Sequence, residues 1–252
     1  MNIATSKTLR KVPEIILLFW VVKLLTTAMG EATSDFFVYR YNPYLVVILG
    51  GIALLLVLMI QFSVSRYIAW VYWSAVSMVA VFGTMAADAL HIQLHVPYIV
   101  STIFFAIVLA AVFIVWYRSE RTLSIHSINT RRREMFYWAA VLATFALGTA
   151  SGDLTAITVG LGYFSAGLLF GGLIIIPAIA YWFGLNEIFC FWFAYILTRP
   201  LGASFADWMS KRQSIGGLGW GDGHVAVGLT IIIIVFVGYL AHSHSDVKDR
   251  QS

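Results

Sequence analysis

Four aspartates recur at a fixed spacing in this sequence of 252 residues. Each aspartate lies five residues after a glycine, and each glycine lies ten residues after a tryptophan; the four units are Trp20–Gly30–Asp35, Trp73–Gly83–Asp88, Trp138–Gly148–Asp153 and Trp192–Gly202–Asp207. If the four carboxylates meet, they cannot all stay ionised without a counter-cation, so they would share protons or hold a metal ion. Carboxylate oxygens suit protons and hard divalent cations rather than soft metals.

The aspartates also allow a structural interpretation. Each of them could hydrogen-bond a neighbouring loop or helix end and thereby fix one repeat against the next. An ionisable group inside a membrane span is costly, which favours the functional interpretation, but both alternatives stay open. The candidate proton or cation ligands, and the candidate ligands of a bound divalent cation, are therefore Asp35, Asp88, Asp153 and Asp207.

Three further charged residues lie within or beside the same apolar segments. Lys23 and Glu31 belong to one polar stripe, which should face the protein interior or a water-filled path. Lys23 could be a counter-charge that moves as the acids load and release cations, or it could form an ion pair with an acid of another helix. Arg199 precedes Pro200, which favours a kink, and we expect Arg199 to pair with one of the four aspartates or to gate the site. Lys23, Glu31 and Arg199 are the candidate coupling or gating residues.

The elements that must position these residues are membrane helices. Hydrophobic residues make up 60% of the chain and charged residues 11%, and the mean hydropathy is +0.86, which excludes a water-soluble enzyme and a disordered protein. A single cysteine, Cys190, excludes an internal disulfide framework. Eight segments are long and apolar enough to span a bilayer as helices: 13–36, 43–63, 67–89, 97–117, 134–157, 160–183, 187–209 and 225–241. The predicted fold class is an all-α, polytopic helical bundle.

Basic residues predict the orientation of the bundle. With the N-terminus inside, the inner segments carry 11 lysines and arginines, among them Lys7, Lys248 and Arg250, whereas the outer side carries Arg40, Lys211 and Arg212. The positive-inside rule then places both termini in the cytoplasm. The net charge of +4 is thus an orientation signal rather than a sign of nucleic-acid binding. The basic inner loop divides the chain into a first half (1–118), a linker (119–133) and a second half (134–252).

The spacing of the units predicts their symmetry. The motif glycines are separated by 53, 65 and 54 residues, so that each unit contains one motif helix and one plainer helix. Four such units place the motif helices parallel, related by an axis along the membrane normal. Small residues recur every fourth position around the glycines, which predicts close helix packing at Gly30, Gly83, Gly148 and Gly202. The motif tryptophans are interpreted as an interfacial belt.

Two other patterns are weaker signals of chemistry. Asp88, His91 and His95 are spaced so that they could place three metal ligands on one helix face, but the following sequence resembles a loop and favours a satisfied or solvated histidine pair. The glycine-rich stretch 216–223 lacks the residues of a phosphate-binding loop and is interpreted as a flexible outer loop. No nucleophile–base–acid set is evident, so no enzyme is predicted.

The four units, together with Arg118-Ser119-Glu120 and Ser124-Ile125-His126-Ser127-Ile128 between the halves, resemble a bacterial family of uncharacterised membrane-anchored proteins built from four two-helix repeats of unknown function. The resemblance covers nearly the whole chain. It implies a multi-pass protein of the bacterial inner membrane and carries no activity with it.

These patterns favour a transporter or exporter of small cations, either protons or hard divalent metal ions. The alternative is a structural or sensory membrane protein whose aspartates only lock the helix bundle. The expected partners are the lipid bilayer and a small cation, with no nucleic acid, and the oligomeric state is left open.

Overall fold

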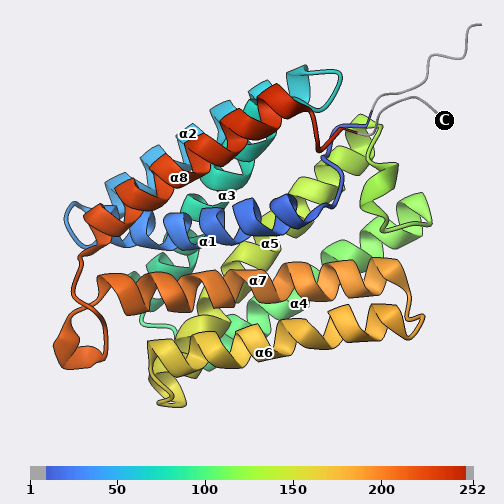
Figure 1. Cartoon of the computed structure of the whole chain (residues 1–252). Helices are drawn as coiled ribbons and strands as arrows, with labels where there is room; N and C mark the ends of the chain where they lie inside the picture. Colours follow the sequence, from blue (N-terminus) through green and yellow to red (C-terminus); the bar gives the residue numbers. More distant parts are fainter. Residues whose placement is uncertain (1–9, 248–252) are drawn as a thin grey trace, which may run out of the picture.

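The computed structural model describes residues 10–247, which form eight long helices and no strand within that range. The helices are α1 (Leu17–Val38), α2 (Pro43–Ser63), α3 (Ala69–Asp88), α4 (Tyr98–Glu120), α5 (Arg131–Asp153), α6 (Tyr163–Trp182), α7 (Glu187–Ser210) and α8 (Asp222–Ser243) (Figure 1). A π-helical turn extends α3 (Ala89–Gln93) and another extends α5 (Leu154–Thr158). Short 3₁₀ turns lie at Ile125–Ser127 and Gln213–Ile215. The all-helical prediction is confirmed.

Three of the helix starts are fixed by polar caps. The side chain of Asn42 accepts hydrogen bonds from the backbone of Tyr44 and Leu45, and Pro43 occupies the first helical position of α2. Asn186 caps α7 in the same way, and Thr130 caps α5. These caps lie in short polar segments between apolar runs. The starts predicted from the sequence for these helices therefore lie close to the observed ones.

Seven of the eight helices are long and apolar enough to cross a membrane, and α1 is the exception. It has the length, but Lys23, Glu31 and Asp35 interrupt its apolar surface and are buried inside the bundle. The sequence also starts this segment too early, at residue 13. The helix begins only at Leu17, because the preceding chain is extended and Glu14 donates its backbone N–H to the carbonyl of Asp246 at 2.9 Å.

Four helices form the centre of the bundle, and we call α1, α3, α5 and α7 the ring helices. Each packs against two others in the cyclic order α1, α3, α5, α7 and back to α1. The remaining helices are peripheral: α2 packs on α3, α4 on α5, α6 on α7, and α8 on α1. Because α8 packs on α1, the last helix of the chain covers the first. Every peripheral helix therefore covers the ring helix of the following pair, and α8 closes the circle.

The motif glycines lie where neighbouring ring helices approach most closely. A Cβ on Gly30 would lie 2.5 Å from the Cβ of Ala80 in α3, and one on Gly83 would lie 2.7 Å from the Cβ of Phe145 in α5. Gly148 faces the side chain of Arg199 in α7, and Gly202 faces that of Thr27 in α1, in both cases with no room for a methyl group. The four contacts follow the same cyclic order as the helices, so each glycine packs its helix against the next.

The motif tryptophans lie together at one end of the bundle, which we call the Trp end. Trp73, Trp138 and Trp192 are buried, and only Trp20 is partly exposed. The prediction of an interfacial belt is therefore wrong. The indole rings pack in an aromatic cluster instead: Trp73 lies 5.6 Å from Phe19, between ring centroids, and the indole N–H of Trp192 donates to the carbonyl of Leu123 at 2.9 Å.

Both ends of the described chain reach the Trp end. Lys11 forms a 2.6 Å ion pair with buried Glu134 of α5, and Tyr67 donates a hydrogen bond to Asp246 after α8. Gln61 donates to the second oxygen of Glu134 at 2.9 Å, so the buried carboxylate is fully partnered. The basic loop between α4 and α5 lies at this end too. Lys7, Lys248 and Arg250, which contribute to the predicted orientation, fall outside the described residues.

Candidate functional site

The four motif aspartates lie together at the opposite end of the bundle, which we call the Asp end. Asp88 and Asp153 are the last α-helical residues of α3 and α5, and a π-helical turn follows each of them. Asp35 and Asp207 lie within the last turns of α1 and α7. Since all four ring helices place their aspartates at this end, the spacing seen in the sequence becomes a cluster of carboxylates. Turns of the π type are frequent at functional sites.

Two overlapping groups of ligand atoms are present in this cluster. Oxygens of Glu31, Asp153 and Asp207 all lie within 4.8 Å of one another, and so do ligand atoms of Asp88, His91 and Asp153. Asp153 belongs to both groups. Within the described part of the chain, no ion pair or hydrogen bond satisfies its carboxylate. A carboxylate in this position is a natural ligand for a proton or a hard cation.

His91 joins the cluster, whereas His95 does not. The π-helical turn continues the helix past Asp88, so that His91 lies near the carboxylates; its Nε2 is 2.6 Å from Ser101 Oγ. Its other ring nitrogen, Nδ1, is buried and has no hydrogen-bond partner in the range 10–247. His95 lies in the following loop in a left-handed conformation, with φ of 53°. His91 is thus partly satisfied, by Ser101, but it lies on a helical turn and not in the expected loop, because helical structure extends further than the sequence indicates.

Lys211 joins three carboxylates at the Asp end, whereas from the sequence it is counted only among the basic residues of the outer side. Its ammonium forms ion pairs with Asp35, with Asp222 at 3.3 Å and with Asp207 at 3.6 Å. Burial alone would lower the pKa of Lys211, but the charges of Asp35, Asp207 and Asp222 outweigh it and raise the pKa above its usual value. The only signal in the sequence is its position four residues after Asp207, one helical turn further along.

The glycine-rich segment before α8 holds the end of α7. The backbone N–H groups of Leu218, Gly219, Trp220 and Gly221 donate to four consecutive carbonyls of residues 208–211 at 2.7 to 3.1 Å. Gly216, Gly219 and Gly221 have positive φ angles, which other residues adopt only with strain. The segment was interpreted as a flexible outer loop; it is a hydrogen-bonded cap that fixes Lys211 on one side and Asp222 on the other.

Arg199 lies at the centre of the bundle, below the aspartates. Its Nη2 donates to Glu31 at 2.6 Å, to the hydroxyl of Thr149 at 2.7 Å and to the hydroxyl of Thr84. The prediction that Arg199 pairs with an aspartate is wrong, because the motif aspartate of α7 lies eight residues further along, about 12 Å up the helix. Glu31, Thr84 and Thr149 each follow a motif glycine directly. The gap-free alignment of the units therefore places these three residues at equivalent positions of their helices.

Lys23 lies deeper toward the Trp end and is buried without a carboxylate. Its ammonium donates to the hydroxyl of Thr198 at 3.2 Å and lies 4.3 Å and 4.2 Å from the ring centroids of Phe145 and Tyr195. The expected ion pair with an acid of another helix is absent among the described residues. In α3, α5 and α7 the equivalent position holds Val76, Val141 and Tyr195, so α1 alone carries a charge here.

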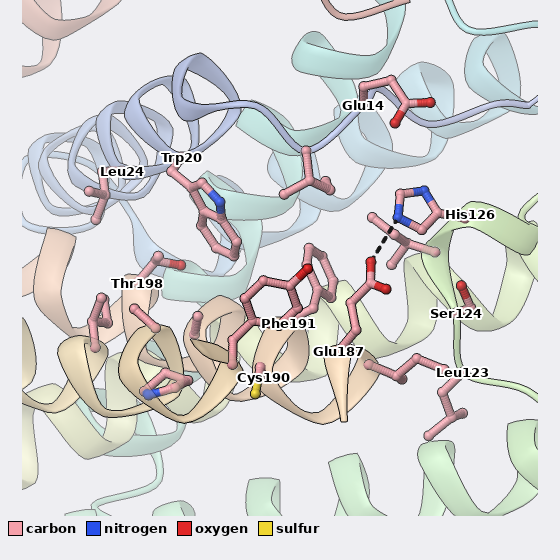
Figure 2. A pocket seen from close by; sticks show the side chains of 18 of the residues that line it. Glu14, Trp20, Leu24, Leu123, Ser124, His126, Glu187, Cys190, Phe191 and Thr198 are labelled. Atoms are coloured by element: carbon pink, nitrogen blue, oxygen red, sulfur yellow. Dashed lines mark ion pairs between the residues drawn. The ribbon is translucent and has the colours of Figure 1, made fainter. Parts of the chain in front are cut away.

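One cavity lies at the Trp end of the bundle and another at the Asp end. The one at the Trp end has a volume of about 560 Å³ and is lined by Trp20, Leu24, Phe191 and Thr198, with His126 and Glu187 paired at 3.3 Å (Figure 2). The cavity at the Asp end has a volume of about 960 Å³ and is lined by Asp35 and Asp222, among others. Because Thr198 also contacts Lys23, the first cavity reaches the buried ammonium through one hydroxyl.

Comparison with known proteins identifies a family. The model of the family described as "Repeat of Unknown Function (DUF347)" matches residues 71–122, 136–184 and 190–245. Each matched range contains one ring helix and the peripheral helix that follows it. The matched ranges begin after α1 and α2, the pair whose ring helix carries Lys23 and Glu31. No curated protein and no solved structure matches the chain. The chain therefore belongs to this family of repeats of unknown function.

Proposed function

We propose that this protein is an integral membrane transporter or exporter of small cations, either protons or hard divalent metal ions. The observation that carries the proposal is the carboxylate of Asp153, which belongs to both groups of ligand atoms and has no ion pair or hydrogen bond among residues 10–247. Six acidic side chains meet at the Asp end, while the bases that form ion pairs with them there are Arg199 and Lys211. The remaining carboxylates need protons or a cation. The ligands we assign are Asp35, Asp88, Asp153 and Asp207.

The proposed orientation places the Trp end in the cytoplasm of a bacterial inner membrane. The basic loop, with Arg131, Arg132 and Arg133, lies at this end, and so do both ends of the described chain, which supports the positive-inside assignment. The Asp end then faces outward, and the four two-helix repeats are related by an axis along the membrane normal. The cyclic contacts of the ring helices support this symmetry.

Polar side chains suggest a path along the α1–α7 interface. From the outer cavity it runs through Asp35 and the acid cluster to Glu31 and Arg199, and then through Lys23 and Thr198 to the inner cavity. The cationic guanidinium of Arg199 fills the centre of the path, so an open cation channel is disfavoured. We assign Glu31, Arg199 and Lys23 to coupling or gating, with the Arg199–Glu31 pair as the barrier that must rearrange during transport.

A non-transporting role is the second candidate, and a specific contact favours it. Lys211 ties Asp35 of α1, Asp207 of α7 and Asp222 of α8 together, which is what a structural lock requires. It leaves Asp88 and Asp153 without a cation, since Asp88 receives only a 3.3 Å hydrogen bond from Ser34. Neither carboxylate adds to a lock, and that of buried Asp88 also costs desolvation, so the transport proposal explains more of the cluster.

The deciding experiment compares Asp153→Asn with Glu120→Gln, a matched removal of one acid at the Trp end that lines neither cavity. The purified proteins are reconstituted in liposomes, and both proton and Mn²⁺ fluxes are measured. Transport predicts that Asp153→Asn loses flux while it unfolds at the same temperature as the wild type, and that Glu120→Gln keeps its flux. Absence of proton and Mn²⁺ flux in the wild-type protein would reject the proposal in favour of the lock.

The orientation has its own test. Cys190 is buried and is first replaced by alanine, and single cysteines are then introduced by Arg132→Cys in the basic loop and Gln213→Cys at the Asp end. In intact cells a membrane-impermeant thiol reagent should label the cysteine at position 213 and not the one at position 132. The reverse labelling would place the Asp end in the cytoplasm.

A further inference from the structure

The ammonium of Lys211 occupies a position suited to a free cation. It lies between Asp35, Asp207 and Asp222, which come from three different helices, and its Nζ is 5.3 Å from the ring centroid of Tyr39. Carboxylate oxygens on several sides and an aromatic face on another are the surroundings of a bound cation. No other lysine or arginine in residues 10–247 pairs with three carboxylates.

The backbone and the side chain of Lys211 differ in freedom. The glycine-rich cap fixes the backbone, because Gly219 donates to the Lys211 carbonyl at 2.8 Å and Gly217 packs directly against it. The side chain is a four-carbon stem that is 16% exposed. Two of its three carboxylates, those of Asp35 and Asp222, line the cavity of about 960 Å³ at the Asp end. The ammonium therefore contacts two carboxylates that border this cavity, while its backbone is held by the cap.

We propose that the Lys211 ammonium is a tethered cation that occupies the outermost subsite of the acid cluster and that an incoming divalent cation must displace it. The inference rests on the transport function proposed above and names its substrate class. A divalent ion brings two positive charges to the carboxylates of this subsite, whereas the ammonium brings one. The ion also coordinates the carboxylate oxygens directly. Arrival of the ion thus frees the Lys211 ammonium. When the ion leaves, the ammonium returns and again neutralises part of the negative charge of the carboxylates.

The test uses Mn²⁺ as the probe and the purified, full-length protein. Lys211→Met removes the charge and keeps the length of the side chain, Lys211→Arg keeps the charge, and Arg212→Met removes the neighbouring exposed charge. Coupling between two binding events typically changes the affinity of one of them by about 5- to 150-fold. We therefore expect Lys211→Met to bind Mn²⁺ at least about fivefold more tightly than the wild type. Lys211→Arg and Arg212→Met should show no such gain.

The outcomes separate this inference from the transport proposal. If the wild type binds Mn²⁺ and Lys211→Met binds it equally or more weakly, Lys211 is a structural bridge and the inference is overturned, while the cation site stands. If none of the proteins binds Mn²⁺, the inference is also overturned, and the proton flux of the wild type then decides the transport proposal by itself.

A second measurement needs no variant and covers the case in which Lys211→Met fails to fold. The wild-type protein is acetylated with an amine-reactive reagent in the presence and absence of Mn²⁺, and modification of Lys211 is quantified by mass spectrometry. Displacement predicts several-fold more acetylation of Lys211 with Mn²⁺ bound, because the amine is then released from its carboxylates. Unchanged or reduced acetylation would show that the cation does not replace the ammonium.

Discussion

Arg199 donates a 2.6 Å hydrogen bond to Glu31, a residue 168 positions earlier in the chain, and both side chains are buried at the centre of the helix ring. The pair connects α7 to α1, the last ring helix to the first. Thr84 and Thr149 add hydroxyl oxygens from α3 and α5, so that all four ring helices meet at one guanidinium group. The Arg199 layer, formed by these four residues, separates the acid cluster from Lys23 and the inner cavity.

Glu31→Gln should destabilise the protein strongly. The substitution leaves the guanidinium of Arg199 buried without a counter-charge, and breaking a buried ion pair in this way typically costs about 3–5 kcal/mol. Glu187→Gln, which removes an exposed acid, should change the free energy of unfolding by less than about 0.5 kcal/mol. Chemical unfolding in detergent measures both. A small effect of Glu31→Gln would mean that water or another carboxylate compensates Arg199.

Thr149→Val should weaken the same layer to a smaller extent. Valine has the shape of threonine but cannot accept the hydrogen bond from Arg199, and a hydrogen bond to a charged group is worth about 1.5–3 kcal/mol. Thr230→Val is the matched control, because the Thr230 hydroxyl bonds only the carbonyl of Ala226 in its own helix. Equal unfolding free energies for the two variants would argue against a role of Thr149 in holding Arg199.

Gly202→Ala should disrupt the contact between α7 and α1. A Cβ at this position would lie 2.8 Å from the Cβ of Thr27 and still closer to its hydroxyl, and overpacking of this kind costs about 1–3 kcal/mol. Gly228→Ala in α8 is the control, because a Cβ there meets no atom within 4 Å and alanine favours the helix by up to about 1 kcal/mol. The prediction is wrong if both substitutions change the unfolding temperature in the same direction.

Cation binding should weaken as the pH falls. Carboxylates must lose their protons to bind a metal, so Mn²⁺ affinity should be lower at about pH 5.5 than at about pH 8.5, with protons released on binding. The pKa of Lys211 is raised by its carboxylates, so its ion pairs are fully present below the pKa of an unfolded lysine, about 10.4, and are lost only as the pH rises through the higher, folded value. The ammonium stays charged throughout this range.

Because the charge of Lys211 is constant in this range, the pH dependence of Mn²⁺ binding can be compared between the wild type and Lys211→Met. Wild-type protein and Lys211→Met should show the same direction of pH dependence between about pH 5.5 and about pH 8.5, because Lys211 stays charged there and its removal leaves the other titrating groups in place. Isothermal titration with Mn²⁺ in two buffers of different ionisation enthalpy counts the released protons. If the pH dependence disappeared in Lys211→Met, the titrating group would be the lysine and not the carboxylates.

The sequence predicts the helices, and the gathering of the four aspartates on the ring helices, for physical reasons. Runs of about 20 apolar residues can only be helices in a bilayer, since every backbone group must be satisfied within the segment. Trp, Gly and Asp at a constant spacing in four units mark equivalent places on equivalent helices. These two arguments gave the all-helical fold and named Asp153 as a candidate ligand, and the membership of the repeat family was recognised from the same units.

Which charged residues pair with which was decided by the tertiary structure. Arg199 meets Glu31 and not an aspartate, Lys23 meets aromatic rings and a hydroxyl, and Lys211 meets three carboxylates. Spacing along a helix fixes depth and face, but an ion pair between helices also depends on their rotation and offset, which the packing of glycines such as Gly202 sets to within a few ångströms. The sequence by itself therefore determines that the acids gather at one end, whereas only the packed ring determines that Asp153 is left without a cation.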